Sequence, residues 1–117
     1  MRSATVTLGI FLAAVSITRL HSQDLPVQFV DGNKLLRWCV GENVNERNLC
    51  LGYLMAVIDD VPTYNTALKS LCVRVPKGID SLQVRDIVVK FLRDYPKIRH
   101  QTASMNAIMA LHDAWGC

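Results

Sequence analysis

The sequence lacks the short motifs by which most small catalytic and cofactor-binding sites are recognised. It has no CxxC pair, no HExxH, no glycine-rich phosphate loop and no serine-centred nucleophile elbow. A zinc site needs cysteine and histidine ligands at close spacing, and no histidine lies at that spacing from a cysteine pair. We therefore expect no cofactor, no metal site and no catalytic residue, and we interpret the chain as a binding protein rather than an enzyme.

The chain also lacks a large excess of positive or negative charge. The whole chain carries a net charge of +3, but a cut after Ser22 would remove Arg2 and Arg19 and leave 11 Lys and Arg against 10 Asp and Glu. Binding to nucleic acid or to anionic lipid needs a concentrated basic surface, so we expect neither partner. One short basic cluster, which we interpret as a solvated face near a helix end, consists of Lys90, Arg93, Lys97, Arg99 and His100.

Long apolar runs are absent except near the N-terminus. The run from Ala4 to Ile17 follows Arg2 and has the length of a signal-peptide core, whereas a membrane-spanning helix needs about 20 apolar residues. We predict that residues 1–22 are a signal peptide, cut after Ser22 or alternatively after Ser16, and that the mature protein lies in the periplasm without stable membrane insertion. A retained N-terminal anchor is the alternative. Residues 23–30 are then a leader, and residues 31–117 are one domain.

The four cysteines all follow the predicted signal peptide. An even number of cysteines in an exported chain predicts two disulfides, here among Cys39, Cys50, Cys72 and Cys117. Their count alone permits three pairings. Because disulfides consume the thiols, a catalytic cysteine is not expected.

Apolar periodicity divides the domain into four helices. We place them at residues 33–40, 46–61, 80–95 and 102–115. Asp80 and Gln83 resemble a capping box, and Thr102 can cap the last helix. Residues 63–71 are either a loop or one further helical turn.

The helix at residues 46–61 is apolar nearly all the way round, which predicts a place in the middle of a bundle. Gly52 costs about 1 kcal/mol relative to alanine inside a helix, so we expect a neighbouring helix to approach it closely. Pro62 is expected to end this helix. Gly41 is expected to end the preceding helix in the left-handed conformation.

Short connectors favour antiparallel neighbours, so the predicted fold is all-α, a small four-helix antiparallel bundle stapled by two disulfides. Cys39 ends the first helix and Cys50 lies near the start of the second, so we predict that they pair. Cys72 precedes the third helix and Cys117 follows the fourth, and an antiparallel pair brings these two positions to the same end of the bundle. Cys72–Cys117 is therefore the second predicted disulfide.

Two groups of polar side chains were considered for chemistry. His112 and Asp113 are adjacent on a helix and point about 100° apart, so we interpret them as surface residues. Asp59 and Asp60 stand at the C-terminal end of a helix, where carboxylates oppose the helix dipole. One interpretation is a solvated helix end without a further role; otherwise stabilising contacts from nearby Lys or Arg, or from a partner, offset the unfavourable interaction with the dipole.

Several cysteine-anchored segments resemble those of the Tai family of type VI secretion amidase immunity proteins, over about residues 29–117. The segments are Leu35-Leu36-x-Trp38-Cys39, Cys50-Leu51-Gly52-Tyr53-Leu54, Pro76-x-Gly78 leading into Val88-Val89-Lys90-Phe91-Leu92 and Pro96, and the terminal Trp115-x-Cys117. The chain departs from the family pattern at Ala56, where a second glycine is common, and at Gly116, where a proline is common.

The resemblance implies a periplasmic, all-helical, often dimeric protein that inhibits a secreted peptidoglycan amidase by occluding its active site. The expected partner is this effector, with a homodimer as a further possibility. We predict the effector-facing surface at the connector after Pro62, where an aromatic side chain stands among hydrogen-bonding ones. Its residues are Thr63, Tyr64, Asn65 and Thr66. The alternative functions are a periplasmic acid-stress chaperone and a hydrolase of unrecognised type.

Overall fold

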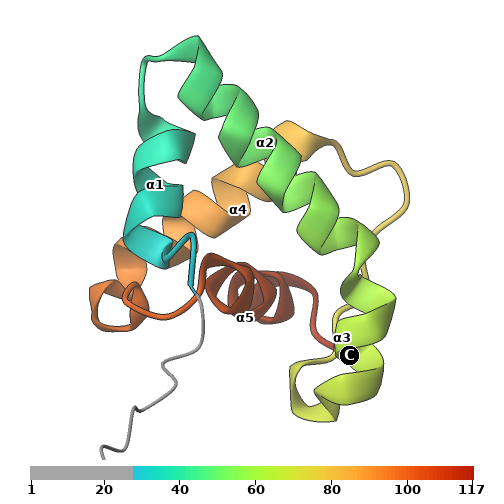
Figure 1. Cartoon of the computed structure of the whole chain (residues 1–117). Helices are drawn as coiled ribbons and strands as arrows, with labels where there is room; N and C mark the ends of the chain where they lie inside the picture. Colours follow the sequence, from blue (N-terminus) through green and yellow to red (C-terminus); the bar gives the residue numbers. More distant parts are fainter. Residues whose placement is uncertain (1–27) are drawn as a thin grey trace, which may run out of the picture.

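The computed structural model describes residues 28–117, which form an all-helical domain (Figure 1). Its five α-helices are α1 (Gly32–Val40), α2 (Val44–Asp59), α3 (Val61–Ala67), α4 (Ser81–Asp94) and α5 (Ala103–Trp115), with 3-10 turns at Lys69–Leu71 and Pro96–Ile98. The prediction of an all-helical fold is confirmed. The helix beyond the predicted four is α3, in the segment for which the sequence left loop and helix open. The predicted signal peptide and residues 23–27 of the predicted leader lie outside the described residues.

Polar side chains fix where four of these helices begin. Asp31 accepts a hydrogen bond from the Lys34 amide at 2.7 Å, and Thr102 accepts one from the Met105 amide at 3.3 Å. The predicted capping box is present at α4: the Asp80 carboxylate accepts from the Gln83 amide, and the Gln83 side-chain oxygen accepts from the Asp80 amide. At α2, Asn43 accepts from two amides and starts the helix at Val44, before the predicted start at residue 46. Each cap satisfies backbone donors that would otherwise have no partner.

The hydrophobic core lies where α4 and α5 pack on each other and on α1 and α2. Its fully buried aliphatic side chains come from all four of these helices: Leu35, Leu54, Val88, Leu92, Ile108 and Leu111. On α4 the buried residues recur at spacings of three and four, and the charged residues occupy the opposite face. Burying one such aliphatic side chain contributes about 1.5–3 kcal/mol, so this interior holds the domain together.

Both disulfides join elements that the sequence predicted to meet. Cys39 pairs with Cys50 across the α1–α2 connection, with 5.1 Å between their Cα atoms. Cys72 pairs with Cys117 at 5.4 Å. The second link is reinforced by backbone hydrogen bonds, since the Arg74 amide donates to the Trp115 carbonyl at 2.8 Å and the Cys117 amide donates to the Cys72 carbonyl. The C-terminus is thereby held against the segment that precedes α4.

Gly41 ends α1 as predicted, but it does so in an extended conformation, with φ at −68°, so the expected left-handed conformation is wrong. A Cβ at this position would lie 2.9 Å from the Arg37 carbonyl oxygen, so a side chain would clash there. The expectation that Pro62 ends a helix is wrong. It stands in the first turn of α3, where its missing N–H costs nothing because that amide would have no acceptor within the helix.

Within residues 28–117, every helix is too short or too polar to cross a lipid bilayer.

Candidate partner-binding surface

The four residues predicted to face a partner lie on α3 rather than on an open connector. Thr63 and Thr66 are exposed, and the Thr66 hydroxyl donates to the Pro62 carbonyl at 3.1 Å. Tyr64 is half-buried and packs against the core. The exposed part of this predicted site is therefore small, and its role in partner binding stays a prediction.

Asn65 has a structural role that its sequence context did not reveal. Its side-chain amide donates to the Val73 carbonyl at 2.9 Å and accepts from the Val73 amide at 2.8 Å. Val73 is buried beside the Cys72–Cys117 disulfide. Asn65 thus ties α3 to the segment before α4, and these two bonds use one of its two N–H donors and one of the two lone pairs of its oxygen.

A broader candidate surface lies on α2, which is not enclosed by the other helices. Figure 1 shows α2 along an edge of the domain. The buried residues Cys50, Leu54 and Val57 mark its inner side. The opposite side, which we call the α2 outer face, consists of Leu49, Gly52, Met55, Ala56 and Asp59, all exposed. The prediction that this helix lies in the middle of a bundle is wrong, because one side of it meets solvent.

Exposed apolar side chains make the α2 outer face unusual for a surface helix. Leu49 and Met55 keep 51% and 55% of their surface accessible, and both stand next to Gly52 on the helix. Between these two side chains the glycine leaves the helix backbone uncovered. A surface helix ordinarily turns polar residues outward, and α2 does not do so over its central turns.

Gly52 itself has no packing partner in the domain. A Cβ built at this position meets nothing within 4 Å, so the expected close approach of a neighbouring helix is wrong for the described residues. Glycine in a helix interior costs about 1 kcal/mol relative to alanine. Packing within the described domain therefore does not offset the loss of helix stability caused by Gly52.

A hollow of about 260 Å³ borders the α2 outer face where α2 meets the start of α4. We call it the Asp59 hollow. Its apolar lining residues are Met55, Ile58, Ile79 and Val84, and its polar lining residues are Asp59, Asp80 and Ser81. Small-molecule pockets commonly measure about 300–1,000 Å³, so this hollow lies just below that range.

The carboxylates at the end of α2 have no cationic partner in the described part of the chain. Among residues 28–117, the ion pairs within 4.0 Å are Arg85–Asp86 and Lys90–Asp94. Neither pair includes Asp59 or Asp60, and both aspartates are exposed at the negative end of the helix dipole. Of the two sources of compensation that the sequence left open, nearby Lys or Arg is thus not used within these residues.

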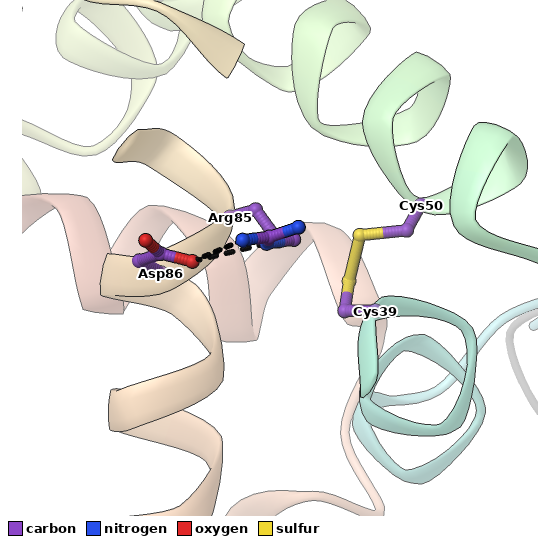
Figure 2. The surroundings of a disulfide bond; sticks show 4 residues. All are labelled: Cys39, Cys50, Arg85 and Asp86. Carbon is purple, nitrogen blue, oxygen red and sulfur yellow. Dashed lines mark hydrogen bonds and ion pairs between the residues drawn. A yellow bond between two sulfur atoms is a disulfide. The ribbon is translucent and has the colours of Figure 1, made fainter. Parts of the chain in front are cut away.

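A second, basic hollow lies beside the Cys39–Cys50 disulfide. Figure 2 shows Arg85 between this disulfide and Asp86. The Arg85 guanidinium donates to one Asp86 oxygen through Nε at 3.0 Å and through a terminal nitrogen at 2.7 Å. Arg47 and Arg93 line the same hollow, and so do the carboxylates of Glu42 and Asp86. Three arginines face two carboxylates here, so this hollow has an excess of positive charge, opposite in sign to that of the Asp59 hollow.

The two histidines of the described residues, His100 and His112, both contact backbone carbonyl groups. His100 Nδ1 lies 2.9 Å from the Lys97 carbonyl oxygen, and His112 Nδ1 lies 2.8 Å from the Cys72 carbonyl oxygen. In the part of the chain that the structure describes, His, Cys, Asp and Glu do not gather in a group of three or more that could hold a metal ion. Of the basic cluster, Lys90 is engaged by Asp94 at 2.6 Å, and this carboxylate raises the pKa of the lysine.

Sequence reasoning missed the α2 outer face, although its signal was visible. Apolar residues all round a helix are compatible with two situations: burial by the rest of the same chain, or burial by another chain. The pattern was interpreted as the first situation, a helix in the middle of its own bundle. The choice between them depends on tertiary packing, which periodicity within one helix does not encode.

Comparison with known proteins gives one match. The family model described as Rap1a immunity proteins matches residues 31–117, which is the whole of the predicted domain. No curated protein and no solved structure matches the chain.

Proposed function

The chain belongs to the Rap1a immunity protein family, and from this premise we propose that it is a periplasmic immunity protein that inhibits a type VI peptidoglycan amidase effector. The immunity family implies a protein that acts by binding an effector protein. The proposal adds the kind of effector, the delivery system and the mode of inhibition, which is occlusion of the amidase active site. The observation that carries it is the family match over residues 31–117.

The periplasmic location is proposed from the N-terminal apolar run and from the cysteines. The apolar run before residue 22 has the features of an export signal, and cleavage there would release the domain. All four cysteines are paired in the domain, which is the state that an oxidising compartment maintains. An amidase that attacks peptidoglycan acts in that same compartment, so the inhibitor and its target would meet there.

Inhibition by occlusion needs a rigid surface rather than reactive groups. The two disulfides and the capped helices supply rigidity, and a preorganised surface loses less entropy on binding. A homodimer would enlarge such a surface, and we include it in the proposal as the state to be measured by light scattering coupled to size-exclusion chromatography.

The test is protection in living cells. The full chain, with its own N-terminal segment, is co-expressed with type VI amidase effectors of its own strain that are directed to the periplasm. We expect it to prevent lysis by one of them, and we expect the purified oxidised protein to inhibit that amidase at a one-to-one molar ratio. A chain lacking residues 1–22 is the matched control, because it should stay in the cytoplasm and give no protection.

Continued lysis with every amidase of the strain, while the chain is present and oxidised in the periplasm, would contradict the proposal. The chaperone alternative predicts a different result. Such a protein would expose apolar surface at about pH 2–3 and then suppress aggregation of many unrelated clients.

A further inference from the structure

We propose that the α2 outer face, together with the Asp59 hollow, is the surface that binds the effector, and that the effector inserts a lysine or arginine side chain into the hollow. This inference rests on the proposed function, because the partner is the amidase effector. It replaces the predicted surface on α3 with a larger one on the neighbouring helix. Two independent features of the described residues carry it.

The first feature is the uncompensated glycine. Gly52 lowers helix stability, and a Cβ at its position would meet nothing within 4 Å in the domain. Exposed Leu49 and Met55 flank it. A glycine between two raised apolar side chains forms a notch in which the backbone of another protein can approach the helix closely. Removing these apolar side chains from water would then favour association.

The second feature is the charge at the end of the same face. The lining of the Asp59 hollow is mostly apolar, and its polar members are Asp59, Asp80 and Ser81. Asp80 accepts the capping bond from the Gln83 amide, whereas Asp59 is an exposed carboxylate without a cation within 4.0 Å in the described residues. This combination suits a long cationic side chain. The aliphatic stem of a lysine or arginine would lie on the apolar wall while its charged end reaches the carboxylate.

A second copy of this chain suits the surface less well. A symmetric pairing of two α2 helices about Gly52 would bring Asn45 and Asn48 of one copy toward Asp59 and Ala56 of the other. The outward-facing positions of α2 hold no lysine or arginine, since Arg47 lies in the hollow beside the Cys39–Cys50 disulfide. Self-pairing would therefore leave Asp59 without a cation, whereas a different protein can supply one.

The first test uses Gly52, where the effects on folding and on binding have opposite signs. Gly52→Ala should raise the melting temperature, because alanine favours the helix and its Cβ meets nothing. Gly52→Leu should fold as well and should weaken binding to the purified amidase that the wild type inhibits by about tenfold or more, because its side chain fills the notch. Weaker binding by a protein that is not less stable cannot be attributed to unfolding.

The second test reverses the charge in the hollow. Asp59→Lys should weaken binding to the same amidase by at least about tenfold. Asp113→Lys is the matched control, because Asp113 is an exposed carboxylate near the C-terminal end of another helix, α5. This control should bind within about twofold of the wild type, and both variants should keep their melting temperature within a few degrees.

The outcomes separate the two proposals. If the wild type binds no amidase of its strain, the proposed function and this inference both fall. If the wild type inhibits an amidase and Gly52→Leu and Asp59→Lys do so equally well, the function stands and the α2 outer face is not the binding surface. If Gly52→Leu converts a dimer into a monomer with amidase affinity unchanged, a second copy covers this face and the inference is wrong.

Discussion

α2 and α4 are of similar length and pack against each other, yet their residues are distributed differently between the buried and the exposed side. α4 turns Val84, Val88 and Leu92 inward and its charged residues outward, and its one large apolar side chain in solvent is Leu82 in the first turn, 49% exposed. α2 buries Cys50, Leu54 and Val57 and leaves Leu49, Gly52 and Met55 in solvent. Packing within the domain accounts for the apolar residues on the inner side of α2 but not for those on its outer side.

We propose that the difference separates residues that stabilise the fold from residues that bind the effector. Exposed single apolar side chains are common on protein surfaces and need no explanation. An exposed group of them around an unpacked helix glycine, next to an unpaired carboxylate, is less easily explained by the fold. Substitutions on α4 should therefore change the free energy of unfolding, and substitutions on the α2 outer face should change affinity for the effector.

The largest effects are expected from removing the disulfides. Cys39–Cys50 links α2 to α1, and Cys72–Cys117 links the segment before α4 to the C-terminus. Cys72–Cys117 closes a loop of 45 residues and Cys39–Cys50 one of 11. The chain-entropy argument then gives about 4 kcal/mol for the Cys72–Cys117 link and about 3 kcal/mol for the Cys39–Cys50 link. Replacing each pair by alanine and measuring urea unfolding should show the larger loss for Cys72–Cys117. Equal or reversed losses would mean that native packing, rather than loop closure, decides the contribution.

A matched pair of truncations comes next. Leu92 is fully buried on α4, so Leu92→Ala should lower the free energy of unfolding by about 2–5 kcal/mol. Met55 is 55% exposed on α2, so Met55→Ala should change it by no more than about 0.5 kcal/mol. Met55→Ala should instead weaken effector binding. A Met55→Ala protein that is strongly destabilised, or that binds with wild-type affinity, would remove the distinction between the two helices.

The smallest effects concern aspartates at the two helices. Asp80 caps α4 with a complete capping box, so Asp80→Ala should destabilise the protein by about 1 kcal/mol. Asp59 opposes the dipole at the end of α2, so Asp59→Asn should stabilise it by about 0.3–1 kcal/mol at low ionic strength. Thermal unfolding at low and high salt would measure both, and the Asp59 effect should shrink at high salt. A loss of stability in Asp59→Asn would show that the carboxylate has a structural partner.

The sequence predicted most of the fold because local signals and packing agree there. Asp80 with Gln83, Thr102 and the spacing of Val84, Val88 and Leu92 each specify a helix start or an inward face without reference to the rest of the chain. The order of the helices, together with the antiparallel arrangement expected from short connectors, was sufficient to predict both disulfide pairs. α3 was left open because Pro62 ends a helix in one context and starts one in another, and the neighbouring residues do not decide between them.

The binding surface was harder to predict than the fold. Thr63 to Thr66 were chosen for their composition, but Asn65 is occupied by Val73 through a contact eight residues away that composition does not reveal. The α2 outer face was missed because both sides of this helix are largely apolar, so composition does not show which side is exposed. Only the positions of the other helices distinguish them, and these positions depend on contacts distant in the sequence.

The most direct test of the account is site-specific photocross-linking in the periplasm. A benzophenone amino acid is placed at Ala56 on the α2 outer face or at Lys90 on the outward side of α4, and the cells also produce the amidase that the wild-type protein neutralises. The account predicts a cross-link to the amidase from position 56 and none from position 90. A cross-link from position 90 with none from position 56, or one from position 56 that joins two copies of this chain, would contradict it.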